Sequence, residues 1–292
     1  MVLSPYINIL RPLHWTKNIF VFAPLFFGHQ LFEADLFLQT LGMFLGFCLV
    51  SSAVYCLNDM ADLETDKATP DKCLRPLASG ALSLPAVRGM MGFCLLLASA
   101  IILFLCKWTG ILWLAVPVVI YLFLNIAYSL WLKHHAIIDI VCIALGFVLR
   151  ILAGGLTTGI QVSHWIVIMT FLLTLFLALT KRVVEIEQGD SLRKSITGYN
   201  KTFAYMSLSI IAAVIIVCYI LYTLDRDVFT HVGTPYLYTT VIWVLVGLLR
   251  YLQLIIVLER KEGPTTLIIG DLCLMACFVC WLLCFAIFIY LL

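Results

Sequence analysis

Long runs of apolar residues, separated by short polar breaks, dominate this chain. A helix needs about 20 apolar residues to cross the hydrocarbon core of a bilayer, and the sequence offers about nine such stretches. They lie at roughly 13–32, 37–57, 86–106, 110–127, 136–156, 163–180, 203–224, 236–258 and 267–291. A transmembrane barrel would instead alternate lipid-facing and polar residues. The pattern therefore predicts an all-α integral membrane protein built as a helical bundle.

The composition agrees with this fold class, because 63% of the residues are hydrophobic and only 12% are charged. We expect residues 1–292 to form a single transmembrane transferase domain with polar loops at about 58–85, 128–135 and 181–202. The first stretch is not followed by a small-residue cleavage site. We therefore expect it to be retained in the protein.

Lysine and arginine are distributed unevenly over the loops of this nine-helix map. Most of them fall on one side, at 11–17, 67–88, 133, 181–201 and 250–261, whereas Lys107 and Arg226 fall on the other. Positively charged short loops stay in the cytoplasm. This predicts a cytoplasmic N-terminus, an external C-terminus and a cytoplasmic active site in the cell (inner) membrane. A basic cytoplasmic surface suits anionic lipids and phosphorylated substrates.

Nearly all of the 11 cysteines lie inside apolar stretches, where cysteine behaves as a small hydrophobic residue. We expect no structural disulfide. Cys277 and Cys280 have the spacing of a metal or redox pair, but no histidine lies near them to complete a ligand shell. Their pattern favours helix packing.

An acidic segment follows the second apolar stretch. Asp59, Asp62 and Asp66 are spaced i, i+3 and i+7, which predicts three carboxylates on one face of a helix continuing from that stretch. Close carboxylates repel one another unless a cation lies between them. Mg²⁺ is the natural cation, because it combines a few carboxylates with substrate phosphates. The three aspartates are thus candidate metal ligands and catalytic residues, and Asn58 offers an adjacent amide oxygen.

Basic residues come directly after the acidic ones, at Lys67, Lys72 and Arg75. Arginine can hold a phosphate through two donors and lysine acts as a point charge. The segment therefore indicates a composite site for Mg²⁺ and a diphosphate. The alternative is a solvated helix end whose charges make ordinary surface ion pairs. An EF-hand does not fit, because the required glycine and alternating ligands are absent from the segment.

The pattern Asn-Asp-x-x-Asp-x-x-x-Asp, followed by Arg75-Pro76-Leu77 and Ser79-Gly80, resembles the UbiA superfamily of intramembrane prenyltransferases. The resemblance extends over most of the chain. Within that superfamily the chain is most similar to the decaprenyl-phosphate phosphoribosyltransferases, on the basis of Arg11-Pro12-x-x-Trp15-x-Lys17-Asn18, Leu132-Lys133-His134, Asp139, Gly146-Phe147-x-x-Arg150 and Lys181-Arg182.

This resemblance implies a helical bundle around a central cavity, with cytoplasmic caps that hold the diphosphate and a lateral opening toward lipid. Most of the superfamily carries a second Asp-x-x-x-Asp motif after the sixth span. In this chain the equivalent stretch, residues 181–190, reads KRVVEIEQGD. This departure weakens a prenyl-diphosphate mechanism copied from the common members.

Further candidate substrate-binding residues each have a structural alternative. Asp139 and Arg150 fall on nearly the same face of one helix but roughly 16 Å apart along its axis, too far for direct pairing. A charged arginine within a membrane span is costly, which favours a cavity-lining role for Arg150 over a purely structural one. Tyr128, Lys133 and Lys17 lie where either substrate contacts or anchoring at the membrane boundary would place them.

Lys181 and Arg182 have the helical spacing of ordinary ion pairs with Glu185. The resemblance instead makes this segment a second wall of the polar site, with Lys181 and Arg182 contacting phosphate and Glu185 contacting Mg²⁺ or a hydroxyl. No histidine is assigned a role as catalytic base.

The leading hypothesis is Mg²⁺-dependent transfer of a 5-phosphoribosyl group from phosphoribosyl diphosphate to a polyprenyl (decaprenyl-like) phosphate. The alternative is prenyl transfer from a polyprenyl diphosphate to an aromatic or lipid acceptor. A cation-coupled transporter is disfavoured, because transporter sites lie near the membrane midplane. The expected partners are these substrates and the lipid bilayer, without nucleic acid, and a homo-oligomer is left open.

Overall fold

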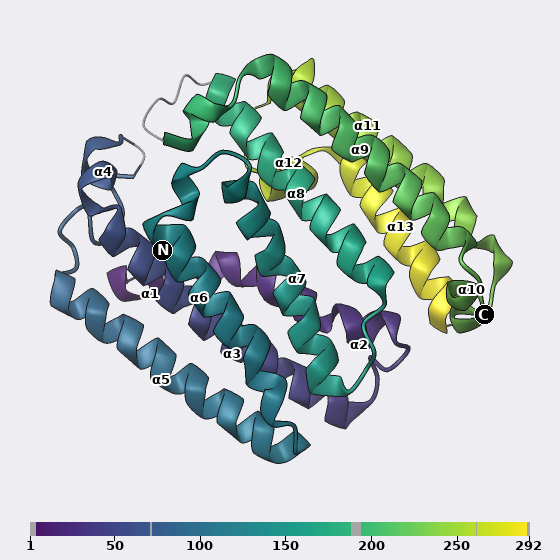
Figure 1. The fold of residues 1–292 in the computed structure, drawn as a ribbon, viewed down its shortest axis with the longest axis horizontal. Helices are drawn as coiled ribbons and strands as arrows, with labels where there is room; N and C mark the ends of the chain where they lie inside the picture. Colours follow the sequence, from purple (N-terminus) through teal and green to yellow (C-terminus); the bar gives the residue numbers. More distant parts are fainter. Residues whose placement is uncertain (1–3, 71, 188–193, 261, 291–292) are drawn as a thin grey trace. The chain divides into compact units, whose positions relative to one another are not determined.

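The computed structural model describes residues 4–70, 72–187, 194–260 and 262–290, and the regular structure in these residues is helical (Figure 1). The α-helices are α1 (Pro5–Leu10), α2 (Ala23–Phe27), α3 (Ala34–Ala61), α4 (Leu63–Ala68), α5 (Leu84–Thr109), α6 (Val116–Leu130), α7 (Ile138–Thr158), α8 (His164–Glu187), α9 (Lys201–Leu224), α10 (Arg226–Val232), α11 (Val241–Ile256), α12 (Pro264–Gly270) and α13 (Leu272–Tyr290). Short 3-10 helices cover Pro12–Phe22, Leu112–Ala115, Leu132–His134, Lys194–Gly198 and Pro235–Thr240.

Within the described residues, 8 helical segments are long and apolar enough to cross a membrane. This number is close to the nine predicted stretches and confirms the all-α membrane fold class. The first predicted stretch, 13–32, forms the 3-10 helix Pro12–Phe22 followed by the short helix α2. Pro12 and Pro24 lie in the first turns of these two pieces, where a residue without an N–H is tolerated.

The chain divides into two compact units, and the boundaries between them include one within helix α7. Unit 1 contains the chain up to Lys133 together with Leu145–Val162, and unit 2 contains His134–Ala144 together with Ser163–Leu292. Each unit has its own buried apolar cluster. The single domain expected from the sequence stays a prediction.

Unit 1 is organised around α3, which packs along α5, α6 and the 3-10 helix Pro12–Phe22 (Figure 1). Its main core lies between these elements and includes Met43, Phe47, Leu105, Leu114 and Tyr121. Helix α5 begins with Ser83 as its N-cap and ends at Gly110, whose φ of 73° is readily adopted by glycine.

Gly154 permits the closest backbone approach in unit 1. A Cβ atom at this position of α7 would lie only 2.0 Å from the carbonyl oxygen of Val21. The 3-10 helix Pro12–Phe22 can therefore lie directly against the second half of α7. This contact positions Asn18, which is one turn before Val21, beside α7.

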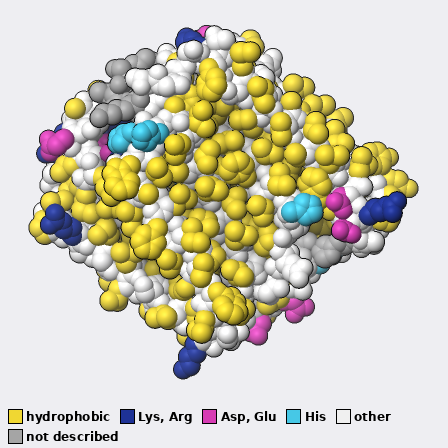
Figure 2. Space-filling model, viewed as in Figure 1, with side chains coloured by type: hydrophobic (Ala, Val, Ile, Leu, Met, Phe, Trp, Pro, Cys, Tyr) yellow, Lys and Arg dark blue, Asp and Glu magenta, His cyan; other side chains and the backbone are white. Residues whose placement is uncertain are grey.

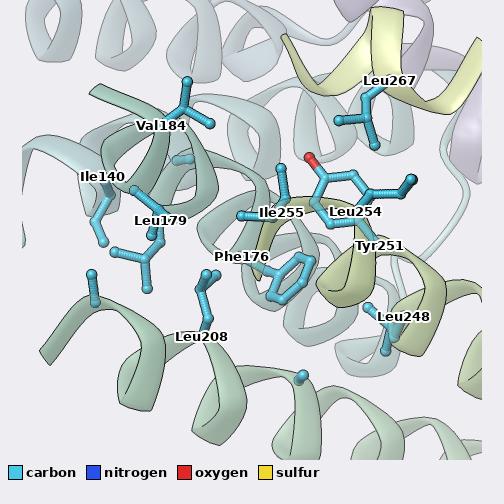
Figure 3. Close-up of a cluster of buried hydrophobic side chains, with 14 of the residues drawn as sticks. Ile140, Phe176, Leu179, Val184, Leu208, Leu248, Tyr251, Leu254, Ile255 and Leu267 are labelled. Atoms are coloured by element: carbon cyan, nitrogen blue, oxygen red, sulfur yellow. The ribbon is translucent and has the colours of Figure 1, made fainter. Parts of the chain in front are cut away.

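Unit 2 packs α8 against α9, and α11 against α9 and α13. Its core, shown in Figure 3, joins Phe176 and Leu179 of α8 to Leu208 of α9 and to Tyr251 and Leu254 of α11. Outside these cores, large hydrophobic side chains are exposed along most of the long helices. Hydrophobic side chains also cover much of the face seen in Figure 2. In a membrane-spanning bundle this is the surface expected to meet lipid.

Candidate active site

The acidic segment is divided between two helices. Helix α3 ends at Ala61, Asp62 has φ −98° and ψ 9°, and α4 begins at Leu63. The prediction of one continuous helix is therefore wrong at Asp62. The backbone remains nearly helical, because Asp62 N donates to Asn58 O at 2.9 Å and Asp66 N donates to Asp62 O at 2.8 Å. The break coincides with a division of the carboxylates between different cations.

Asp59 and Asp66 meet at the guanidinium of Arg75. Its Nη1 atom lies 2.5 Å from Asp66 Oδ2 and 3.2 Å from Asp59 Oδ1. Arg11 forms a second ion pair with Asp59 Oδ1. Asp62 is instead paired with the buried Lys133, which comes from the 3-10 helix after α6. All of these residues belong to unit 1, and we refer to them together as the acidic cluster.

The acidic cluster has the chemistry of a cation site. The side chains of Asp59 and Asp66 are buried, and Asp59 Oδ2 has no hydrogen-bond partner among the described residues. A buried, unpaired carboxylate oxygen is costly unless a cation or donor reaches it. Mg²⁺ usually takes one or two protein carboxylates together with phosphate oxygens. Asp59 and Asp66 fit this requirement.

The third predicted ligand does not join them in this arrangement. In the part of the chain that the structure describes, no three Asp, Glu, His or Cys side chains are grouped closely enough to hold a metal ion. Asp62 instead forms an ion pair with Lys133. Asp62 lies at the break between α3 and α4, so its side chain need not follow the stripe that a continuous helix would give.

Arg11 belongs to the acidic cluster but was not among the predicted site residues. It lies between α1 and the 3-10 helix Pro12–Phe22 with φ 51° and ψ 59°, a left-handed conformation that is uncommon for a side chain other than glycine or asparagine. Its guanidinium also lies 4.9 Å from the ring centre of Tyr55. The Arg-Pro pair that opens the first resemblance motif was the available sequence signal.

A second polar group in unit 1 surrounds Arg150 of α7, which is 5% exposed. Its Nε donates to Asn18 Oδ1 at 2.7 Å, its Nη1 to Gly146 O at 2.7 Å and its Nη2 to the Tyr121 hydroxyl at 2.9 Å. Ser51 lies 3.3 Å from the same hydroxyl. The sequence identified Arg150, but Tyr121 was missed because a tyrosine in an apolar run carries no distinguishing signal.

Unit 2 contains a separate ion-pair network. The fully buried Asp139 of α7 lies 3.0 Å from Arg182 Nε of α8, and Arg182 also pairs with Glu185. Tyr199 donates to Asp139 Oδ1 at 2.9 Å and accepts from Ile137 N at 2.6 Å. Burial raises the pKa of Tyr199, so it remains a hydroxyl donor at neutral pH. The pair of Arg182 with Glu185 is the structural alternative that their helical spacing indicated, and their substrate contacts stay a prediction.

The remaining predicted residues lie around these groups. Lys67 pairs with Glu64 at 2.9 Å on the exposed side of α4, so the structure does not bring it to the aspartates. Lys17 and Lys181 are exposed, whereas Asn58, Lys72 and Tyr128 are half-buried.

The fold is similar to that of solved membrane proteins. A UbiA homolog from Archaeoglobus fulgidus, bound to DMAPP and Mg²⁺, matches 99% of this chain and 100% of its own with a TM-score of 0.73 at 16% sequence identity. The apo structure of a UbiA homolog from Aeropyrum pernix K1 matches 92% of this chain and 98% of its own with a TM-score of 0.68 at 15% identity.

Two relatives are more similar in sequence. The decaprenyl-phosphate phosphoribosyltransferase of Mycolicibacterium smegmatis is 32% identical over 77% of this chain and 72% of its own length. That of Corynebacterium glutamicum is 30% identical over 97% of this chain and 86% of its own length. The model of the UbiA prenyltransferase family matches residues 19–268. The chain therefore belongs to the UbiA prenyltransferase family.

Proposed function

We propose that this membrane protein transfers a 5-phosphoribosyl group from phosphoribosyl diphosphate to a polyprenyl phosphate and releases diphosphate. The observation that carries the proposal is the acidic cluster, in which buried Asp59 and Asp66 are paired with arginines and Asp62 with a lysine. The names of the two relatives support the choice of donor and acceptor. The proposed reaction takes place at the cytoplasmic face of the cell (inner) membrane, where a water-soluble donor is available.

Asp59 and Asp66 are the proposed Mg²⁺ ligands, and Asp62 joins them when its pairing with Lys133 is exchanged. Bound Mg²⁺ would neutralise the charge that develops on the departing diphosphate. In the structure Arg75 holds the place of a cation between two carboxylates. A metal that takes over these carboxylates leaves Arg75, Arg11 and Lys133 available to bind diphosphate oxygens. Metal and diphosphate are thus expected to bind together.

The proposed transfer needs no strong general base. The bond between ribose C1 and the diphosphate oxygen breaks, and its electron pair leaves with the diphosphate. An oxygen of the polyprenyl phosphate forms the new bond to C1 from the opposite face. Because a phosphate monoester is already ionised near neutral pH, no proton has to be removed from the attacking oxygen.

The unit 2 residues have supporting roles in the proposal. The charge of Arg182 is compensated by the carboxylates of Asp139 and Glu185. We therefore assign Arg182 to holding the end of α8 in place and not to binding phosphate directly. The exposed Lys181 is the proposed phosphate contact of this segment. Lys17, Lys72, Asn58 and Tyr128 remain proposed contacts at the edges of the donor site.

Product mass tests the function. Purified protein is incubated with Mg²⁺, phosphoribosyl diphosphate and a polyprenyl phosphate, and a parallel reaction receives a polyprenyl diphosphate with an aromatic acceptor. We expect a lipid heavier by one phosphoribosyl group, and loss of this product when EDTA is added. Prenylation of the aromatic acceptor without any phosphoribosyl lipid would overturn the proposal in favour of prenyl transfer.

Asp66→Asn tests the metal role. The variant removes one negative charge from the carboxylate that faces Arg75, and we expect product formation to fall by at least about 100-fold, as for loss of a group that stabilises the transition state. Binding of Mn²⁺, followed by electron paramagnetic resonance, should weaken in parallel. Asp35→Asn, at an exposed position in the first turn of α3, is the control for loss of one acidic charge in unit 1. Normal turnover and Mn²⁺ binding in Asp66→Asn would contradict the assignment.

A further inference from the structure

The positive charge of Arg150 has no counter-charge among the described residues. Its hydrogen-bond acceptors are an amide oxygen, a backbone carbonyl and a hydroxyl, all of them neutral. Its guanidinium also lies 4.6 Å, 5.2 Å and 5.8 Å from the ring centres of Tyr121, Phe147 and Phe47. Rings and neutral oxygens solvate an arginine, but they leave its net charge buried.

Not all N–H donors of the Arg150 guanidinium are used in these hydrogen bonds. A guanidinium has five N–H groups, and the three hydrogen bonds above use one on each nitrogen. One N–H on each of the two terminal nitrogens is left without a partner among the described residues. Two terminal donors of this kind are what arginine uses to hold a phosphate through two oxygens.

A line of polar side chains on α3 connects this place with the acidic cluster. Ser51, Tyr55 and Asp59 are spaced by four residues and so share one helix face. Ser51 belongs to the hydrogen-bond group of Arg150, Tyr55 lies under Arg11, and Asp59 is paired with Arg11. Ser51 and Asp59 are about 12 Å apart along the helix. An anion at Arg150 would therefore be kept away from the carboxylates while remaining on the same face.

We propose that Arg150, oriented by Asn18 and Tyr121, is the binding site for the phosphate group of the lipid acceptor, separate from the diphosphate site at Asp59 and Asp66. The inference rests on the proposed function and names a subsite for its acceptor. Arg150 lies in the membrane-spanning part of α7 and beside aromatic rings. An anion that reaches it must carry an apolar body, which a lipid phosphate has and a free sugar diphosphate does not.

Direct binding tests this site without requiring turnover. Radiolabelled short-chain polyprenyl phosphate is titrated onto the purified protein in detergent micelles, with the corresponding uncharged polyprenol as competitor. We expect Arg150→Met to weaken polyprenyl phosphate binding by at least about 30-fold and to leave binding of polyprenol and of Mg²⁺ with phosphoribosyl diphosphate within about twofold. Arg88→Met is the matched control, because it removes an exposed arginine from the same unit.

Asn18→Asp provides a second variant that does not remove the arginine. It places a carboxylate where the amide oxygen now lies, 2.7 Å from Arg150 Nε. The new charge would pair with Arg150 and repel a phosphate. We expect this variant to fold as well as the wild type and to lose polyprenyl phosphate affinity to a similar degree.

The outcomes separate this inference from the proposed function. Unchanged polyprenyl phosphate affinity in a folded Arg150→Met or Asn18→Asp variant would overturn the anion site, even if the wild type makes phosphoribosyl lipid. Equal losses for polyprenol and polyprenyl phosphate would also overturn it, because Arg150 would then affect binding of the apolar chain and not of the phosphate. Failure of the wild type to make phosphoribosyl lipid, with selective phosphate binding at Arg150 intact, would count against the donor alone.

Discussion

The two units each bury an arginine, and they treat its charge differently. In unit 2, Arg182 is only 1% exposed and is matched by the carboxylates of Asp139 and Glu185. In unit 1, Arg150 is 5% exposed and is surrounded by neutral acceptors and aromatic rings. A matched pair holds two helices together, whereas an unmatched charge is retained at a cost and is suited to attract an anion.

The backbone beside each ionic group is strained in a similar way. Arg11, which pairs with Asp59 in the acidic cluster, has a φ of 51°. Ile137, two residues before Asp139, has a φ of 70°. A β-branched residue in the left-handed region is a stronger outlier than an arginine. At Ile137 the hydrogen bond from its N–H to the Tyr199 hydroxyl helps to offset this cost. Strain at both places indicates that the polar contacts determine the local backbone.

The largest expected effect distinguishes the two arginines by stability. Arg182→Met leaves Asp139 buried without its cation and should lower the free energy of unfolding by about 3–5 kcal/mol. Arg150→Met leaves only neutral acceptors without their donor and should lower the free energy of unfolding by less than about 2 kcal/mol. Reversible denaturant unfolding in micelles measures both, and adding Asp139→Asn to Arg182→Met should recover part of the loss. Equal costs for the two arginines would remove the contrast between the units.

Gly154→Ala tests the backbone contact that brings Asn18 to Arg150. The added Cβ would lie 2.0 Å from Val21 O, so the 3-10 helix and α7 must move apart. We expect a loss of about 1–3 kcal/mol in unfolding free energy from overpacking. Gly89→Ala on α5 is the control, because its new Cβ would meet no atom within 4 Å beyond the adjoining residues and backbone of its own helix. An unchanged free energy of unfolding in Gly154→Ala would show that the close contact between α7 and the 3-10 helix Pro12–Phe22 is not required.

Arg75→Met tests whether the guanidinium competes with metal for Asp59 and Asp66. Removing it should tighten Mn²⁺ binding by about tenfold, which corresponds to about 1.4 kcal/mol, and should weaken binding of diphosphate. Electron paramagnetic resonance follows the metal, and labelled diphosphate follows the anion. Lys67→Met removes a charge that is paired with Glu64 on the surface and should change neither by more than about twofold. Weaker Mn²⁺ binding in Arg75→Met would reverse the assignment.

The smallest effect concerns Tyr199 in unit 2. Tyr199→Phe removes the hydrogen bond to Asp139 and the acceptor of the Ile137 N–H, and should lower the free energy of unfolding by about 1 kcal/mol at neutral pH. Burial raises the pKa of this tyrosine, so its contribution is present below the unfolded value of about 10 and is lost as the pH rises toward the folded value. Above about pH 10, the free energy of unfolding should therefore fall more steeply with pH for the wild type than for the variant. Parallel curves would contradict this.

The sequence predicted the parts of the site that depend on local spacing. Apolar length predicted the membrane helices, and the three-residue separation of Arg182 and Glu185 indicated their ion pair as the alternative to substrate contacts. Local spacing failed at Asp62, where a helix assumed to be continuous ends. Tyr121 and Tyr199 could not be identified, because nothing in an apolar run or a loop indicates which distant polar group a tyrosine hydroxyl will meet.

The sequence by itself determined that this chain crosses a membrane as helices, and that carboxylates and cations are concentrated in a segment resembling a known family of transferases. Both follow from composition and from separations of a few residues. Only the tertiary structure decided which cation meets which carboxylate. Arg11 reaches Asp59 across 48 residues, and Arg150 reaches Asn18 across 132. Such pairings depend on helix packing, because close approaches such as that of Gly154 to Val21 bring distant segments together.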